Sequence, residues 1–252
     1  MISYKSKREI ELLKQAGHIV YLTHQFLAPY IKPGIKTMEL EVKAEKFIRD
    51  HGATPSFKGY DGFPYTLCIS VNDEIVHGFP SDRILEEGDI ISIDIGACYK
   101  GYHGDSAWTY PVGKISKENE YLLEHTKKAL YEGIKKAKVG ARIGDISYAI
   151  EQYATKYNLG VVKELVGHGV GTSVHEDPNV PNYGKKGTGP KIKDGMVIAI
   201  EPMLTLGSPE IYILDNDWTV VTEDGSNSAH FEHTIAITNE GVEILTGEWK
   251  NG

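Results

Sequence analysis

Acidic residues stand at the ends of two apolar runs of this sequence, where a carboxylate is costly to bury. Asp94 follows Ile90-Ile91-Ser92-Ile93, and Glu201 follows Val197-Ile198-Ala199-Ile200. A charged group buried without a partner costs several kcal/mol, so one such acid alone would simply face solvent. Two acids in the same setting favour a shared partner instead. A divalent cation is the partner that suits carboxylate oxygens.

A third acid, Asp105, comes close to Asp94 if the residues between them form a hairpin. A two-residue loop at Tyr99-Lys100 would place Asp94 directly opposite Asp105. A loop at Lys100-Gly101 would place Asp94 opposite Ala107 instead. Either register leaves both acids on one face of the strand pair, whereas a three-residue loop does so only with a compensating bulge. Like charges across a strand pair repel each other, and a bound cation removes that repulsion.

The C-terminal half supplies a second pair of acids and an imidazole. Glu232 follows Glu201 in this half as Asp105 follows Asp94 in the first half, although more residues lie between Glu201 and Glu232. His168 lies between Gly167 and Gly169, which allow close approach of the backbone. A histidine between glycines is a hydrogen-bonded loop residue about as often as a ligand. A structural calcium cage is one alternative, but calcium prefers oxygen ligands only.

Hydrophobic periodicity predicts two helices followed by strands, and then the same order again. Helices are expected at 6–26, 37–51 (with Thr37 as the cap), 117–137 and 145–157. Strands are expected at 66–71, 89–98, 103–112, 196–206, 218–222 and 229–238.

Two pairs of segments repeat in the same order along the chain. Residues 32–36 resemble 138–142, and residues 88–94 resemble 195–201. This favours an internal duplication over two unrelated segments that share turn chemistry. We therefore expect one domain, 1–252, made of two halves, about 1–115 and 116–252, related by a pseudo-two-fold axis. Their strands would form one curved antiparallel sheet with helices on its outer face, an α+β fold.

The composition narrows the class of protein. The formal net charge of -8 argues against general binding to nucleic acid or membrane surfaces. No apolar run is long enough for a transmembrane helix, and the first ten residues lack the apolar core of a signal peptide. Cys68 and Cys98 are too few for a disulfide framework. We therefore expect a cytoplasmic protein.

Five segments together carry a resemblance to a known family. They are Cys68 to Glu74 with His77-Gly78, Asp94 to Asp105, Gly167 to Gly171 with His175-Glu176, Glu201-Pro202-Met203, and Glu232-His233-Thr234. Their order and spacing, over nearly the whole chain, resemble the methionine aminopeptidases in their short bacterial type I form. The resemblance implies the pita-bread fold. It also implies dinuclear-metal hydrolysis that removes the N-terminal methionine from nascent proteins and peptides, with preference for a small second residue.

The resemblance also implies a ligand set for the metals. Asp105 and Glu232 would bridge two divalent ions, Asp94 would complete one ion, and His168 with Glu201 would complete the other. A set rich in oxygen donors with one imidazole suits Mn²⁺, Fe²⁺ or Co²⁺ better than a thiolate-rich zinc site does. Zn²⁺ and Ni²⁺ remain open as alternatives.

Three residues acquire catalytic roles only through the resemblance. Glu201 would shuttle a proton, His175 would stabilise the developing oxyanion, and His77 would contact the peptide around the scissile bond. On the residues alone, His77 could simply end a strand. His175 could equally form a surface pair with Glu176.

The substrate's first side chain needs an apolar pocket of limited volume. The resemblance implies that Tyr60, Phe63, Cys68 and Trp218 line it, with Phe57 and Val174 nearby and with His77 and His175 at the peptide. Cys68 is expected to be a small apolar wall, because nothing marks it as an activated nucleophile. The chain departs from the usual family pattern at Phe57 (often Cys), Val174 (often larger), His230 (usually Gln) and Ser106 (commonly Thr). His230 is expected to tune the metal shell.

Other readings of the same fold are weaker. A proline-directed aminopeptidase or prolidase usually carries an additional N-terminal domain, for which this chain has no room. Non-catalytic relatives typically lose metal ligands, and all five are present here. The expected partner is the N-terminus of a peptide or nascent chain, near the ribosome, with no nucleic-acid specificity and no membrane. The protein is expected to be a monomer.

Overall fold

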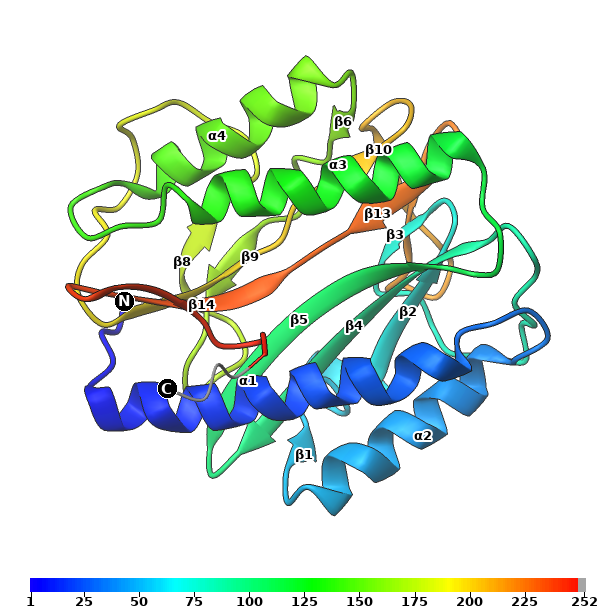
Figure 1. Cartoon of the computed structure of the whole chain (residues 1–252), viewed down its shortest axis with the longest axis horizontal. Coiled ribbons are helices and arrows are strands. Elements are labelled where there is room, and N and C mark those ends of the chain that lie inside the picture. The colour runs from blue at the N-terminus through cyan, green and yellow to red at the C-terminus, as the bar shows by residue number, and fades with distance from the viewer. Residues whose placement is uncertain (249–252) are drawn as a thin grey trace.

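A computed structural model describes residues 1–248 of the chain (Figure 1). The helices are α1 (Lys7–Leu27), α2 (Thr37–Asp50), α3 (Lys117–Ile134) and α4 (Ile143–Lys156), with 3₁₀ turns η1 (Ala28–Tyr30) and η2 (Tyr60–Gly62). The strands of the first half are β1 (Thr54–Pro55), β2 (Leu67–Val71), β3 (Glu74–Val76), β4 (Ile90–Tyr99) and β5 (Tyr102–Pro111). Those of the second half are β6 (Gly160–Val161), β7 (Gly167–Gly169), β8 (Glu176–Val180), β9 (Met196–Ile200), β10 (Met203–Thr205), β11 (Ile211–Ile213), β12 (Val220–Thr222), β13 (Ser228–His230), β14 (His233–Thr238) and β15 (Gly241–Ile244). No helix within residues 1–248 is long and apolar enough to cross a membrane.

The four predicted helices are confirmed, and their capping explains where they begin. Ser6 caps α1 in a capping box, in which its side chain accepts from the Glu9 amide and Glu9 reaches back to the Ser6 amide. Thr37 is not a cap, contrary to the prediction, because it is already the first helical residue of α2. Its hydroxyl instead exchanges hydrogen bonds with the backbone of Ser81, 2.9 and 3.1 Å away.

The β4–β5 hairpin takes the second of the two predicted registers. It closes on Lys100-Gly101, both at positive φ, as a type I′ hairpin turn requires. Asp94 therefore pairs with Ala107, and Asp105 pairs with Gly96. Since these pairs are two residues apart, both acids point to the same face of the hairpin.

The strand predicted at 196–206 is wrong in one respect, because it is broken in the middle. Pro202 has no amide hydrogen to donate to a ladder. β9 therefore ends at Ile200, and β10 starts a different ladder with β6 and β13. Ile200 pairs with His233 of β14, so Glu201 and Glu232 occupy the next opposed position beyond the end of that ladder.

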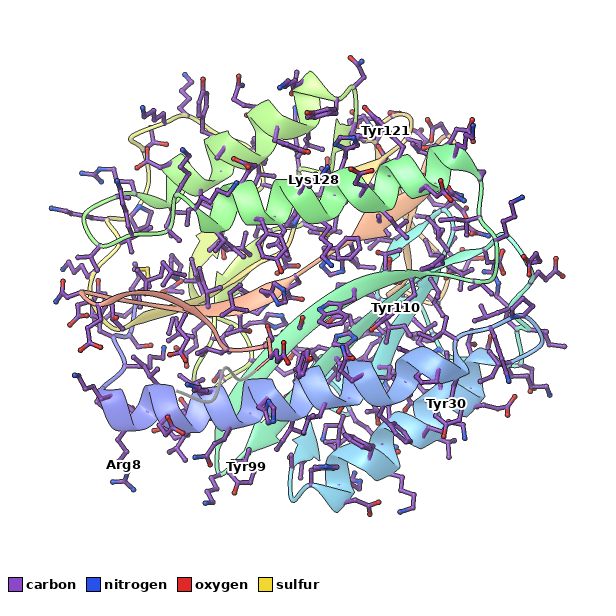
Figure 2. The ribbon with its side chains drawn as sticks, in the orientation of Figure 1. Arg8, Tyr30, Tyr99, Tyr110, Tyr121 and Lys128 are labelled. Atoms are coloured by element: carbon purple, nitrogen blue, oxygen red, sulfur yellow. The ribbon has the colours of Figure 1, made fainter. Side chains whose placement is uncertain are left out.

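The two halves meet along β5 and β14, which run side by side through the centre of Figure 1. The α1–α2 and α3–α4 pairs lie on either side of this seam. One apolar cluster is built from residues 19–112, and another mostly from residues 122–237. On the helix side, the buried His24 ring of α1 lies 3.0 Å from the hydroxyl of Tyr110, which is labelled in Figure 2. The described strand pairs are antiparallel, and the predicted α+β class is confirmed.

The seam itself fixes two of the candidate ligands. The Asp105 amide donates to Thr234 Oγ1 over 3.2 Å, and this hydroxyl donates to the Asp105 carbonyl over 2.7 Å. Ser106 Oγ donates to the Glu232 carbonyl over 2.6 Å. The Glu232 amide donates to the carbonyl of Ala107 over 2.8 Å. One carboxylate from each half is thus held on a locked backbone.

Candidate metal centre and active site

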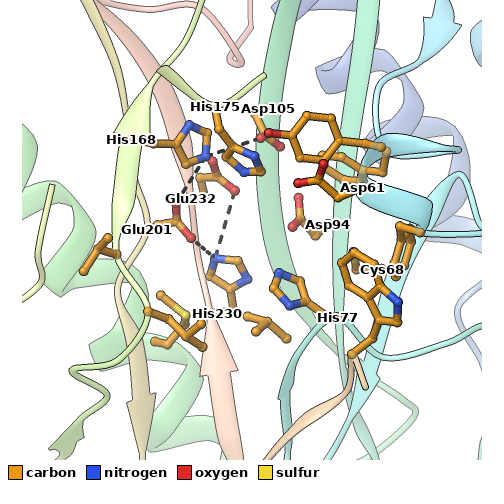
Figure 3. Close-up of a pocket in the computed structure, with 18 of the residues that line it drawn as sticks. Asp61, Cys68, His77, Asp94, Asp105, His168, His175, Glu201, His230 and Glu232 are labelled. Carbon is orange, nitrogen blue, oxygen red and sulfur yellow. Dashed lines mark ion pairs between the residues drawn. The ribbon is translucent and has the colours of Figure 1, made fainter. Parts of the chain in front are cut away.

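The five predicted metal ligands all line one cavity of about 680 Å³ (Figure 3). They come from five segments of backbone: β4, β5, β7, the residue after β9 and the residue before β14. These ligands are Asp94, Asp105, His168, Glu201 and Glu232.

Their donor atoms form two overlapping groups. Asp94, Asp105 and Glu232 each offer an oxygen within 4.8 Å of the others. A ring nitrogen of His168 and an oxygen each of Glu201 and Glu232 form a second group within the same distance. His168 Nε2 also lies 3.7 Å from Asp105 Oδ2 and 3.5 Å from Glu201 Oε1. Glu232 belongs to both groups, which is the arrangement of two neighbouring cation sites that share a ligand.

The carboxylates lack the partners that buried oxygen atoms normally have. One oxygen each of Asp94, Asp105, Glu201 and Glu232 is buried without a hydrogen-bond partner among the described residues. Buried polar atoms are hydrogen-bonded in the great majority of cases. Four unpartnered carboxyl oxygens that line one cavity fit a cation.

Electrostatics leads to the same conclusion. Burial, together with the neighbouring Glu201, raises the pKa of Asp94 to about 7, although His230 acts in the opposite direction. Burial raises the pKa of Glu201 to about 8. Burial and the adjacent acids hold the pKa values of Asp105 and Glu232 well above their ordinary range. These carboxyl groups therefore ionise together at neutral pH only if positive charge is supplied.

His168 is presented to this group as a neutral imidazole. Burial lowers its pKa to about 3. Its Nδ1 lies 2.9 Å from the Gly169 carbonyl, which can only accept, so Nδ1 carries the hydrogen and Nε2 keeps its lone pair toward the acids. The glycines on either side are required, because a Cβ at Gly167 or Gly169 would lie 2.4 or 2.2 Å from a facing carbonyl oxygen.

The two predicted peptide-contacting histidines also reach the cavity. His77 directly follows β3 and adopts a left-handed backbone, with φ of 57°, a conformation that costs energy outside glycine and is common at functional sites. The His175 ring packs edge-on against His168, with centroids 4.2 Å apart. The alternative surface pair of His175 with Glu176 is wrong, because the Glu176 carboxylate is bonded to Lys5 instead.

The predicted apolar pocket forms one wall of the cavity. Phe57, Phe63, Cys68 and Val174 form a buried cluster, against which Tyr60, Tyr65, Phe79 and Trp218 pack. Val174 is only 1% exposed and lies behind the wall, so it shapes the lining indirectly and is not among the lining residues. Burial raises the pKa of the Cys68 thiol well above its usual value, which agrees with an inert wall.

Two contributors to the site have no signal in the sequence. Asn182 donates to the Glu201 carbonyl over 3.1 Å. Asp61, at a positive φ in η2, lines the cavity. Each is an ordinary polar residue in a loop or strand, and only the fold shows what it contacts.

Residues 11–239 match the profile of metallopeptidase family M24. Methionine aminopeptidase 1 of Bacillus subtilis (strain 168) is 56% identical over 246 residues, which cover 98% of this chain and 99% of that protein. The chain belongs to family M24 and, within it, to the methionine aminopeptidases. As a metallopeptidase it uses divalent metal ions.

The solved structures place the chain within the family by its fold. A methionine aminopeptidase from Thermotoga maritima superposes with a TM-score of 0.97 at 43% identity, covering 98% of this chain and 100% of that one. The prolidase from Pyrococcus furiosus has a TM-score of 0.79 at 25% identity, and this chain covers 66% of it. The predicted pita-bread fold is therefore confirmed, and the proline-directed alternative is a more distant relative that shares it.

Proposed function

We propose that this M24 peptidase removes the N-terminal methionine from peptides and nascent proteins whose second residue is small. The observation that carries the proposal is a group of four buried, unpartnered carboxylates beside an aromatic pocket in one cavity. The matching relatives that are named methionine aminopeptidases support the same activity.

We further propose that the centre holds two divalent ions. Asp105 and Glu232 would bridge them, Asp94 would complete one ion, and His168 with Glu201 would complete the other. The two overlapping donor groups support this assignment. The donor set suits Mn²⁺, Fe²⁺ or Co²⁺, with Zn²⁺ and Ni²⁺ as alternatives. When bound, the ions supply a Lewis acid for the peptide carbonyl and lower the pKa of water toward neutrality.

The surrounding side chains would then move the proton and hold the peptide. Glu201 has its carboxylate in the cavity, 3.5 Å from His168 Nε2, and would shuttle the proton. His175, which faces the cavity beside His168, would donate to the developing oxyanion. His77 reaches the cavity from the Trp218 side, with ring centroids 6.1 Å apart, and would contact the peptide.

The apolar wall would take the methionine side chain. Phe63 and Trp218 meet edge to face with centroids 5.1 Å apart, and Tyr60 lies 5.1 Å from His175. An aromatic surface of this kind suits a flexible thioether, which packs well against aromatic edges. Phe57 also lines the cavity, and Val174 belongs to the same buried cluster without lining it.

We also propose that residues 1–252 form a single catalytic domain of two related halves, about 1–115 and 116–252. The repeated order of two helices and a long strand pair supports this, as do the two apolar clusters. The protein would act as a monomer in the cytoplasm, near the ribosome where its substrates emerge. Two free cysteines agree with that compartment.

Peptide hydrolysis by metal-stripped protein, resupplied with Mn²⁺ or Co²⁺, tests the proposed activity. Met-Ala-Ser, Leu-Ala-Ser and Ala-Pro-Ala serve as matched substrates. We expect metal-dependent release of methionine from the first peptide alone. Cleavage of Ala-Pro-Ala without the methionyl peptide would favour the proline-directed alternative. Absence of turnover with two ions bound would show that the pocket assignment is wrong.

The turn that carries His175 is braced by the N-terminal segment. Glu176 accepts 2.6 Å hydrogen bonds from Lys5 Nζ and from Ser3 Oγ, and its other oxygen accepts from the Ser173 amide over 3.3 Å. The Lys5 side chain is 5% exposed. Burial acts to raise the pKa of Glu176, but the bonds from Lys5 and Ser3 lower it overall. Lys5 is therefore a positioning residue for the neighbouring His175.

Replacing Lys5 by methionine is expected to lower kcat about tenfold with little change in KM, because the freed Glu176 releases the turn. Lys5→Arg should restore most of the activity. Lys7→Met is the control, because Lys7 pairs with Glu240 on the exposed surface, where such pairs contribute little. Steady-state kinetics with a thermal melt distinguishes positioning from misfolding. An unchanged kcat in Lys5→Met would contradict the role of Lys5 in positioning the turn that carries His175.

A further inference from the structure

One further imidazole, that of His230, faces the candidate metal ligands. His230 is 2% exposed, and its Nε2 atom is buried without a hydrogen-bond partner among the described residues. This atom lies 3.6 Å from Glu201 Oε2 and 4.0 Å from Glu232 Oε2. Figure 3 shows the ring between these two acids and His77. Leaving a buried ring nitrogen unpaired costs about 1–3 kcal/mol, so its retention requires an explanation.

The backbone prevents the ring from turning away. The His230 amide donates to Thr109 Oγ1 and the Thr109 hydroxyl donates to the His230 carbonyl, both over 2.9 Å. On the other side His230 pairs with Met203 in the β10–β13 ladder. Alternation along the strand then directs the His230 side chain into the cavity.

The distances match those of a ligand better than those of a hydrogen bond. An N–H···O bond spans about 2.7–3.2 Å, so neither carboxylate accepts one from His230. Two donors that lie about 2.1 Å from one ion, at ligand–metal–ligand angles of about 90° to 140°, are about 3–4 Å apart. His168 Nε2 stands 3.5 and 3.7 Å from its two acids, and the His230 separations fall in the same range.

The two imidazoles lie on opposite oxygens of one acid. His168 faces Glu201 Oε1, whereas His230 faces Glu201 Oε2. Glu232 contributes an oxygen to the His168 group and also faces His230. His230 therefore faces both acids of the Glu201–Glu232 pair.

We propose that His230 Nε2 is a sixth protein ligand of the metal centre, so that the pair of ions is bound by two imidazoles. This inference rests on the proposed dinuclear function. A glutamine at position 230 would offer the metal only an amide oxygen, which is a weak ligand, whereas an imidazole nitrogen suits Fe²⁺, Co²⁺, Ni²⁺ and Zn²⁺. The centre should accordingly favour these ions over Mn²⁺ more strongly than a centre with one imidazole.

X-ray absorption of the Co²⁺-loaded protein tests the proposal, because imidazole rings give distinctive multiple scattering. We expect two imidazoles for each pair of ions in the unaltered protein and one in His230→Gln. Calorimetric titration with Co²⁺ should show weaker binding of one ion, by about ten- to a hundredfold. The matched control is His125→Gln, since His125 lies on α3 and bonds to Tyr153 over 3.0 Å, outside the cavity.

The unaltered protein decides the question even if His230→Gln fails to fold. Two bound ions with a single imidazole overturn the assignment of His230 but leave the proposed function standing. If folded His230→Gln binds its ions with the same number of imidazoles, His230 is not a ligand. This holds even if Co²⁺ binding weakens, because His230 would then only orient the neighbouring ligands. Failure of the unaltered protein to bind two ions overturns the dinuclear centre itself.

Discussion

Glu201→Gln is expected to lower kcat/KM for a methionyl peptide by between about a hundred- and ten-thousandfold. Glutamine keeps the volume of the side chain but removes both its negative charge and its capacity to accept a proton. Glu201 has its carboxylate in the cavity, 3.5 Å from His168 Nε2, so the change affects ion binding and proton transfer together. Steady-state kinetics at saturating Co²⁺ measures the loss.

The control for this change is Glu240→Gln. Glu240 is exposed and its surface pair with Lys7 contributes little, so its loss should leave kcat/KM within about twofold. Metal content must be measured in parallel, because Glu201→Gln removes a candidate ligand. Retention of more than about a tenth of the activity with both ions bound would contradict the role of Glu201 in proton transfer.

Removal of the metal is expected to make the protein progressively less stable as the pH rises from about 6.5 to about 8. In the unfolded chain all carboxyl groups are already ionised over this range. The folded metal-free protein still holds protons there, because the pKa of Asp94 is raised to about 7 and that of Glu201 to about 8. Each carboxyl that keeps its proton lowers the unfolding free energy by about 1.4 kcal/mol per pH unit.

Buried histidines set the lower limit of this pH window. Burial lowers the pKa of His168 to about 3 and those of His77 and His230 to about 4. Below pH 6.5 these rings are protonated in the unfolded chain but not in the folded one, which makes stability rise with pH and opposes the carboxyl contribution. The unfolded rings are about half protonated at pH 6.5 and nearly all neutral by about pH 7.5, so their opposing contribution fades and the carboxyl contribution prevails.

Thermal melts of chelator-treated protein at pH 6.5 and pH 8 measure the effect. We expect the melting temperature to fall by about 5 °C or more, since about 1 kcal/mol corresponds to about 2–4 °C in a chain of this length. Protein loaded with Co²⁺ should not show the decrease, because the bound ions replace the protons. A metal-free melting temperature that rises between these pH values would show that the acids are not a coupled, buried group.

The long elements of the fold could be predicted because their determinants are local. Ser6 with Glu9 marks the start of α1, and alternating or continuous apolar runs mark β4 and β9. A two-residue loop allows the hairpin two registers, and the structure adopts the one that closes on Lys100-Gly101. The break between β9 and β10 also has a local determinant, because Pro202 has no amide hydrogen to donate within a ladder.

The remaining strands are short and depend on partners far away in the chain. β6 has two residues and β7 three, and their sequences contain glycines that disfavour strands in isolation. They form because β9 and β10 present unpaired edges to them. No local periodicity records such a pairing.

The candidate site shows the same division. The acids could be identified because a charge at the end of an apolar strand is unusual, and this signal is present in each residue's own neighbourhood. Ser106, Thr234 and Lys5 carry no such signal, since their contacts lie 126, 129 and 171 residues away. The indirect position of Val174 likewise depends on how the wall packs.

The N-terminal brace has a consequence for the order in which the enzyme becomes competent. Lys5 is among the first residues to be synthesised, but its partner Glu176 follows 171 residues later, and its backbone partner Gly195 later still. At about 5–20 residues per second, Lys5 waits on the order of 10–40 s for them. The turn that carries His175 therefore acquires its support only when most of the chain has been translated, and a truncated chain ending before residue 176 cannot assemble it.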